Sequence, residues 1–214
     1  MLTGYQLIIF DWDGTLVDSK ALAIKSTIRA ATDLGYPAPP PEVIGEQFGA
    51  ELTDMLQNLF PNGDIAALTA KFYHYFIEDD AVSNQLFPNV YETLVFLKNS
   101  GFKLAIATNR IRVRIEAALK VSSLRNFFSA VKTADDGGPK PNPAMVEAIL
   151  AELHISKANT LLVGDSLADM ACAQNLGIDA IAVCYGCNTR EQLALYHPLA
   201  LIDDFQTLIH LVTR

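Results

Sequence analysis

The chain has 214 residues, of which 50% are apolar and 19% charged, a composition typical of a folded globular protein that excludes a disordered one. Its formal net charge of -8 excludes nonspecific binding to nucleic acid as an expected function, because a phosphate backbone attracts clustered lysine and arginine. No apolar stretch approaches the ~20 residues of a membrane span, and no basic region precedes the first apolar stretch. We therefore expect a cytoplasmic protein that does not bind membranes.

The first predicted strand, residues 7–10, leads directly into Asp11-Trp12-Asp13-Gly14-Thr15. Aspartate disfavours strands and is costly to bury as an ion, so a pair beside a buried strand requires a charge partner or a catalytic role. Gly14 permits a sharp backbone turn at this point. The alternative is that Asp11 and Asp13 are solvated loop residues or helix caps, and the pentapeptide alone leaves both interpretations open.

The next seventy residues contain no convincing strand. Helical periodicity covers residues 20–34, 42–46, 52–60 and 65–80, and glycines and prolines separate these segments. We predict an all-helical cap domain over residues 16–84, inserted into a core domain made of residues 1–15 and 85–214. Because the insert begins directly after the aspartate pair, it is placed to cover a site at the end of the first strand.

From residue 85 onward, predicted strands alternate with predicted helices. The strands cover residues 103–107, 130–132, 160–164, 180–184 and 200–202, and the helices cover 90–99, 113–120, 143–153 and 167–176. This alternation predicts an α/β fold, a doubly wound, Rossmann-like parallel sheet with helices on both faces. In such sheets, ligands bind beyond the carboxyl ends of the strands.

Polar residues lie at three further places on that edge of the sheet. They are Thr108 and Asn109 after the second strand, Lys140 in a loop rich in proline and glycine, and Asp165, Ser166 and Asp169 after the fourth strand. Each has an ordinary explanation taken alone, since lysines are usually exposed and Ser166 or Asp165 can cap a helix. Crowded carboxylates, however, repel one another, and a hard cation such as Mg²⁺ relieves that repulsion. With a lysine and a hydroxyl group, Mg²⁺ would form a cradle for a phosphoryl group.

Four ordered motifs together resemble those of the haloacid dehalogenase-like hydrolase superfamily. They are Asp11-x-Asp13-Gly14-Thr15, Thr108-Asn109, Lys140-Pro141 and Gly164-Asp165-Ser166-x-x-Asp169, and they span almost the whole chain. The helical insert is similar to that of the branch with a helical cap, which includes phosphoglycolate phosphatases, pyrophosphatases and β-phosphoglucomutases. The resemblance implies a Mg²⁺-dependent phosphatase that hydrolyses a small phosphorylated metabolite, first of all 2-phosphoglycolate, through an aspartyl-phosphate.

Three alternatives remain open from the sequence. A phosphosugar mutase of the β-phosphoglucomutase type would share the first half-reaction, and a pyrophosphatase is the other enzyme alternative. A catalytically silent binding or regulatory protein would keep the same fold without turnover. The oligomeric state is not predicted by any pattern in the sequence.

The resemblance also implies a role for each motif residue. Asp11 would be the nucleophile, and Asp13 the general acid and base, which fits phosphoryl transfer because halide departure needs no proton. Phosphoryl oxygens would be bound by Thr108, Asn109 and Lys140. The metal would be held by Asp11, Asp165 and the backbone carbonyl of Asp13. Asp169 would orient a metal-bound water or Lys140, and Ser166 would likewise act without direct contact with the substrate.

Substrate selection is assigned to residues near the insert. Arg110 follows Thr108-Asn109 directly, where relatives often carry lysine, and it either reaches a substrate anion or lies at an exposed helix start. Gln47 and Phe48 belong to a segment whose glycines would let it turn towards the site, although phenylalanine is more often a core residue. The aromatic residues Phe72, Tyr73, Tyr75 and Phe76 are predicted to pack within the cap and against the core.

The cysteines do not form a disulfide framework. Cys172, Cys184 and Cys187 are an odd and sparse set in a chain of this length. Cys184 and Cys187 have CxxC spacing, but a structural zinc site requires four ligands, and the sequence offers no second pair. We expect these cysteines to be chemically inert.

Overall fold

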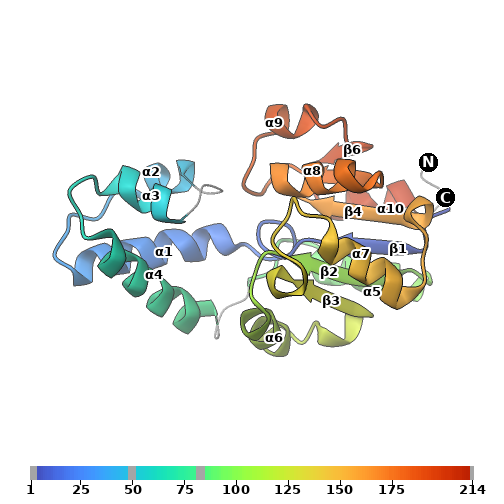
Figure 1. Cartoon of the computed structure of the whole chain (residues 1–214), viewed down its shortest axis with the longest axis horizontal. Helices are drawn as coiled ribbons and strands as arrows, with labels where there is room; N and C mark the ends of the chain where they lie inside the picture. Colours follow the sequence, from blue (N-terminus) through green and yellow to red (C-terminus); the bar gives the residue numbers. More distant parts are fainter. Residues whose placement is uncertain (1–3, 48–51, 81–84, 213–214) are drawn as a thin grey trace.

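The structure is a computed structural model that describes residues 4–47, 52–80 and 85–212. It has two parts (Figure 1), an α/β unit and a separate group of helices that extends from one end of it. None of the described helices is long and apolar enough to cross a membrane.

The α/β unit is built on a six-stranded parallel sheet in the order β3-β2-β1-β4-β5-β6. The strands are β1 (Leu7–Phe10), β2 (Lys103–Thr108), β3 (Ala130–Thr133), β4 (Thr160–Gly164), β5 (Asp179–Val183) and β6 (Ala200–Ile202). In the register of the sheet, Phe10 pairs with Ile106 of β2 and with Val163 of β4. The predicted doubly wound α/β fold is confirmed, and each strand is found within one residue of its predicted ends.

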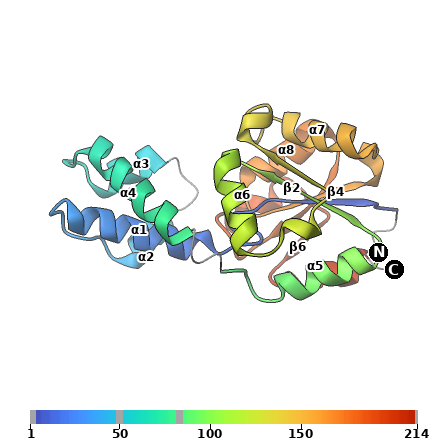
Figure 2. The ribbon, with the colours of Figure 1, turned by 90° about the horizontal axis from the view of Figure 1, so that it is seen from below.

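Helices cover both faces of the sheet (Figure 2). One face carries α5 (Val90–Asn99), α6 (Arg112–Val121) and α10 (Thr207–Val212), which pack against an apolar cluster that includes Ile8 and Phe10. The other face carries α7 (Ala144–Leu153) and α8 (Leu167–Leu176), which pack against a cluster that includes Leu7 and Ile9. Because β1 is buried on both faces, it is a continuous apolar run rather than an alternating one.

Short elements complete the α/β unit. They are α9 (Arg190–Ala194) and the 3-10 helices η1 (Arg125–Phe127), η2 (Ala134–Asp136) and η3 (Lys157–Asn159). The N-cap of α7 is Pro143, one residue after Asn142, whose Oδ1 accepts a hydrogen bond from the Ala144 N–H at 3.0 Å.

The second part consists of α1 (Ser19–Asp33), α2 (Pro41–Glu46), α3 (Leu52–Leu59) and α4 (Ile65–Asp80). These helices have an apolar cluster of their own, which includes Leu56, Leu68 and Phe72. The two connecting segments are bonded to each other, because the Asp18 N–H donates to Gln85 O and the Phe87 N–H donates to Leu16 O. The helical insert therefore extends from a point just beyond β1 (Figure 1).

Candidate active site

Polar side chains from separate loops meet at the carboxyl ends of β2, β1 and β4, which are neighbours in the sheet. Together with the insert, they line a cavity of about 490 Å³. Most of the residues predicted for the site line this cavity, namely Asp11, Asp13, Thr108, Asn109, Arg110, Lys140, Asp165 and Ser166. The folding of the sheet has thus brought together segments that are more than a hundred residues apart in the chain.

Lys140 is the centre of the charge network. Its Nζ donates to Asp11 Oδ1 at 2.5 Å, to Asp169 Oδ1 at 2.6 Å and to the carbonyl oxygen of Ala107 at 2.7 Å. Burial by itself would lower the pKa of Lys140, but the two carboxylates outweigh burial and raise this pKa. Asn109 Oδ1 accepts the Lys140 backbone N–H at 2.7 Å, which fixes the loop. Lys140 is therefore a buried, fully bonded cation.

Asp169 is fully buried behind Lys140. Its Oδ1 accepts from Lys140, and its Oδ2 accepts from the backbone N–H of Ser166 at 3.0 Å and from the Ser166 hydroxyl at 2.5 Å. Ser166 Oγ in turn accepts the Asp169 N–H at 3.1 Å, so the two residues form a capping box at the start of α8. Both carboxylate oxygens of Asp169 therefore accept hydrogen bonds, and the bond to Oδ1 holds the Nζ of Lys140 in position.

Asp165 is held from two sides. Thr15 Oγ1 donates to its Oδ1 at 2.8 Å, and the Cys187 backbone N–H donates to its Oδ2 at 2.7 Å. A side chain at Gly14 or Gly186 would collide with it, because a Cβ at these positions would lie 2.1 or 2.2 Å from Oδ2. Burial and the neighbouring Asp169 carboxylate raise the pKa of Asp165 to about 6, against the hydrogen bonds from Cys187 and Thr15.

The buried acids form a site that fits a divalent cation. Oxygens of Asp11, Asp165 and Asp169 lie within 4.8 Å of one another. Burial raises the pKa of Asp11 well above its ordinary value; Lys140 opposes this shift, and Asp169 and Asp165 add to it. A raised carboxyl pKa means that the ionised form lacks stabilisation, which a bound cation supplies. Since Lys140 and Ser166 engage both oxygens of Asp169, Asp11 and Asp165 are the acids best placed to hold a cation.

Asp13 is paired with Arg110. Arg110 Nε donates to Asp13 Oδ2 at 2.7 Å and Nη2 donates to Oδ1 at 2.6 Å, a bidentate arrangement with well-defined geometry. Burial alone would raise the pKa of Asp13, but Arg110, with a smaller contribution from Arg114, lowers this pKa. Arg110 is 7% exposed, so its location is not that of an exposed helix start.

The remaining predicted residues lie elsewhere. Gln47 follows the last residue of α2, where its Oε1 accepts from Asn58 Nδ2 at 3.1 Å, and it does not line the cavity. The segment that was expected to turn towards the site is helical up to Glu46. Pro41 is the first residue of this helix, a position that proline favours. Phe48 lies outside the described residues.

Several groups that contribute to the site were given no role from the sequence, namely Thr15, Arg114, Cys187 and the carbonyl of Ala107. Cys187 was considered only as a thiol, whereas its backbone N–H is the group that contacts Asp165. A signal was present, because Cys187 follows β5, the neighbour of β4 in the sheet. Burial and the Asp165 carboxylate raise the pKa of the Cys187 thiol, which agrees with an unreactive side chain.

Comparison with known proteins gives matches along nearly the whole chain. A family model described as haloacid dehalogenase-like hydrolase matches residues 8–183. The phosphoglycolate phosphatase of Vibrio cholerae serotype O1 is 32% identical over 222 residues, which cover 99% of this chain and 98% of the relative. Pyrophosphatase PpaX of Anoxybacillus flavithermus is 30% identical over 207 residues, with 96% and 95% covered. A solved structure, described as a predicted phosphoglycolate phosphatase from Haemophilus somnus, superimposes with a TM-score of 0.85 at 26% identity and with 98% and 99% covered.

Proposed function

The chain belongs to the haloacid dehalogenase-like hydrolase family, and from this premise we propose a Mg²⁺-dependent phosphatase that acts on a small phosphomonoester through an aspartyl-phosphate on Asp11. The general class, a phosphoric monoester hydrolase, follows from the family and from relatives named as phosphatases. The proposal adds the metal, the roles of the residues and the first substrate to test, 2-phosphoglycolate. It also assigns residues 16–84 as a cap domain over a core of residues 1–15 and 85–214.

One observation carries this proposal. Lys140 is bonded to both Asp11 and Asp169 beside Asp165, and all four residues are at most 7% exposed. Burying charged groups costs more free energy than an apolar core of the same volume, so stability alone does not account for the cluster. A silent binding protein also has no evident need for both acids, Asp11 and Asp13.

In the first half-reaction, Asp11 attacks phosphorus and forms the Asp11–phosphoryl bond while the bond to the leaving oxygen breaks. Asp13 gives its proton to that leaving oxygen, and Thr108, Asn109 and Lys140 bind the phosphoryl oxygens as their charge develops. In the second half-reaction, a water molecule attacks phosphorus and gives its proton to Asp13. Phosphate leaves, and the carboxylate of Asp11 is regenerated.

The oxygen donors at the site fit Mg²⁺, which prefers such ligands. Asp11, Asp165 and the backbone carbonyl of Asp13 would hold it. When bound, the metal supplies positive charge that offsets the carboxylates and the phosphoryl oxygens. The nucleophilic step requires the ionised form of Asp11, which such a charge would stabilise.

The protonation of Asp13 differs between the two half-reactions. Arg110 lowers its pKa, so Asp13 is ionised at neutral pH in the substrate-free protein, the form that accepts a proton from water. In the first half-reaction it must carry a proton. The negative charge of an approaching phosphate favours that proton, because a nearby anion raises the pKa of a carboxyl group.

The proposal is tested by a screen for phosphate release from 2-phosphoglycolate, an aryl phosphate and other small phosphomonoesters, with Mg²⁺ or with a chelator. We expect release that requires Mg²⁺ and stops when the chelator is added. Activity that persists without metal contradicts the proposal. Isomerisation of β-glucose 1-phosphate faster than phosphate release would identify the mutase instead. A beryllium fluoride adduct at Asp11 without turnover of any phosphate would identify the silent protein.

Pyrophosphate hydrolysis is the second candidate activity. It is supported by the 30% identity with a pyrophosphatase over 96% of this chain. The same catalytic steps apply to pyrophosphate, with inorganic phosphate as the leaving group in place of an alcohol. Pyrophosphate therefore belongs in the same screen, and the higher kcat/KM decides between the two substrates.

A further inference from the structure

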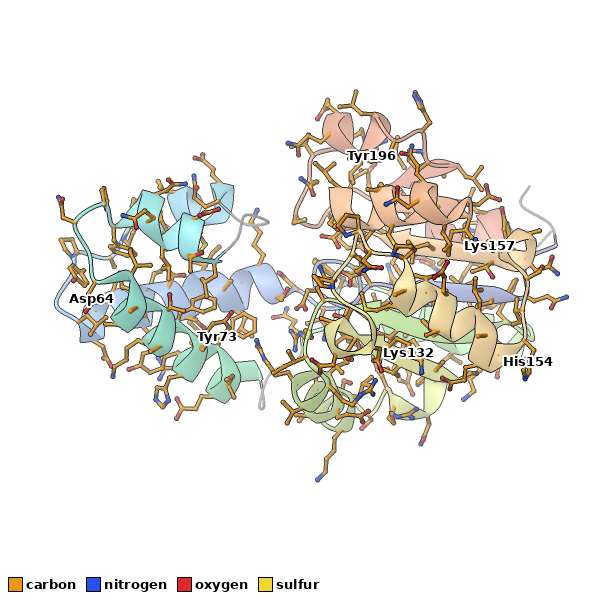
Figure 3. All side chains as sticks on the ribbon, viewed as in Figure 1. Asp64, Tyr73, Lys132, His154, Lys157 and Tyr196 are labelled. Carbon is orange, nitrogen blue, oxygen red and sulfur yellow. The ribbon has the colours of Figure 1, made fainter. Side chains whose placement is uncertain are left out.

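On one side of the cavity, two arginines of the α/β unit lie against aromatic rings of the insert. We call this side the wall, and its residues are Arg110, Arg114, Tyr73 and Phe76. The guanidinium carbon of Arg114 lies 4.7 Å from the ring centroid of Phe76 and 5.9 Å from that of Tyr73. The guanidinium carbon of Arg110 lies 5.9 Å from the same Phe76 ring. Figure 3 labels Tyr73 on α4 of the insert. All four side chains line the cavity that holds Asp11.

The guanidinium group of Arg114 lies against two rings of the insert and lines the cavity. Its N–H donors lie in the plane of the group, and this planar edge is the part of an arginine that recognises anions. That edge matches the two oxygens of a carboxylate or the oxygens of a phosphate. Contact with the rings also restricts the side chain, so less conformational freedom is lost when an anion binds.

The insert supplies no charge to the described lining of the cavity. Its contributions there are Ser19, Ala23, Leu52, Met55, Phe72, Tyr73 and Phe76. Lys71, a cation of the insert, is bonded instead to Asp33 on α1 at 2.9 Å. Among the described residues that line the cavity, the positively charged ones are therefore Lys140, Arg110 and Arg114, all from the α/β unit.

These cations have different positions relative to the reacting atoms. Lys140 donates a hydrogen bond to Asp11, the proposed nucleophile, and Arg110 donates to both carboxylate oxygens of Asp13. Arg114 lies against the same Phe76 ring as Arg110, the residue that is bonded to Asp13. Since Asp13 is the proposed proton donor to the leaving oxygen, this position is on the side of the leaving group.

We propose that Arg114 binds an anionic group carried by the leaving group of the substrate. The preferred substrates are then phosphate esters of hydroxy acids or pyrophosphate, rather than phosphate esters of neutral alcohols. This inference rests on the proposed phosphatase function and extends it to the substrate class. It makes Arg114 a specificity-determining residue that the α/β unit supplies, whereas the insert supplies the rings that orient it.

A matched pair of substrates tests the inference. 2-Phosphoglycolate and 2-hydroxyethyl phosphate have nearly the same size and differ in a carboxylate against a hydroxymethyl group. We expect the protein to prefer 2-phosphoglycolate in kcat/KM. In Arg114→Met, kcat/KM for 2-phosphoglycolate should fall by roughly 10- to 100-fold, mainly through KM, as expected for loss of a hydrogen-bonded charge pair. The value for 2-hydroxyethyl phosphate should change less than about threefold, because no charge pair is lost with that substrate.

Two further variants keep the test decisive. Arg114→Lys retains the charge and should recover much of the lost preference. Lys120→Met removes an exposed cation from the far end of the same helix and should change neither substrate. Pyrophosphate is assayed beside the matched pair, and a parallel loss in Arg114→Met extends the role of Arg114 to a phosphate leaving group.

The inference is overturned if Arg114→Met slows both matched substrates equally, because Arg114 would then only join α6 to α4. It is also overturned if the variant slows neither. Failure of the proposed function gives a different result. In that case, the unmodified protein with Mg²⁺ releases no phosphate from these substrates or from an aryl phosphate.

Discussion

The floor of the cavity, formed by Asp11, Lys140 and Asp165, differs from the wall in burial and in the kind of contacts that hold its side chains. On the floor, Asp11, Lys140 and Asp165 are 7%, 5% and 1% exposed, and loops at the ends of adjacent strands hold them by short hydrogen bonds. On the wall, Tyr73 is 42% exposed and the insert contributes apolar and aromatic surface. The floor is thus a buried network of hydrogen-bonded charges, whereas the wall is a more exposed and largely apolar surface. This contrast fits our proposal that the floor performs the reaction and the wall meets the leaving group.

The largest expected effect comes from changing the proposed nucleophile on the floor. Asp11→Asn should lower kcat by at least ~10⁴-fold with every substrate, because loss of the nucleophile removes the covalent route. The measurement is phosphate release with Mg²⁺ from both alkyl and aryl phosphates. Asp203→Asn, which changes an exposed acid on the surface, is the control and should keep full activity. Full turnover in Asp11→Asn would remove Asp11 from the mechanism.

The next effect concerns Asp13, which lies between the floor and the wall. Asp13→Asn should lower steady-state kcat by ~10²- to 10⁴-fold, the usual contribution of general acid and base catalysis. With p-nitrophenyl phosphate, whose leaving group needs no proton, the first half-reaction should survive. Stopped-flow absorbance should then record a burst of about one nitrophenolate per enzyme, because the second half-reaction lacks its base. If the burst is absent and the variant is folded, Asp13 does not act in the second half-reaction.

A smaller effect is expected at Arg110, which fixes the position of Asp13. Arg110→Gln removes the bidentate contact, and we expect roughly a tenfold loss in kcat with 2-hydroxyethyl phosphate, from misplaced proton transfer. The loss with p-nitrophenyl phosphate in the first half-reaction should be smaller. Arg112→Gln, which changes a more exposed arginine on α6, serves as the control. An equal loss with both leaving groups would show that Arg110 does not act through Asp13.

The smallest effect is a dependence of stability on pH and metal. The pKa of Asp165 is about 6 in the folded protein, against ~3.9 in an unfolded chain. A raised folded-state pKa destabilises the protein above about pH 6, and this penalty disappears as the pH falls towards ~4. Without metal, this group should therefore make the protein more stable at about pH 5 than at about pH 7.5.

Mg²⁺ should change that dependence. By stabilising the ionised acids, it should raise the free energy of unfolding at neutral pH by about 2.7 kcal/mol when its concentration is 100 times its Kd. The gain should shrink at about pH 5, where protons compete for the same oxygens. Urea unfolding with Mg²⁺ or a chelator at both pH values measures this. Equal stabilisation at both pH values would argue against binding of Mg²⁺ at these carboxylates.

The floor of the site was accessible from the sequence because its positions follow from topology. Asp11, Thr108 and Asp165 each follow an apolar strand, and parallel strands bring such positions to one edge. Lys140 does not directly follow a strand, and its role was predicted only from the resemblance of the four motifs. Apolar runs and their spacing therefore predicted the fold, and the charged cluster was predicted from these runs together with that resemblance.

The aromatic residues of the wall were predicted to pack within the insert and against the core, but the contact with Arg114 was not predicted, because it depends on side-chain directions and packing between distant elements. Arg114 reaches Phe76 only because α4 returns next to α6, which no local pattern reveals. The bidentate contact of Arg110 with Asp13 likewise depends on one side-chain direction. The role of Cys187 belongs to its backbone, so the identity of the side chain gave no indication of it.

The most direct test of the account is to trap the covalent intermediate on the floor of the site. The protein is mixed with an excess of a hydrolysed phosphate substrate and Mg²⁺, quenched in acid during turnover, digested and analysed by mass spectrometry. We expect a phosphoryl group on the peptide that contains Asp11, localised to that side chain. A phosphoryl group on another residue, or unmodified protein quenched while phosphate is being released, would contradict it.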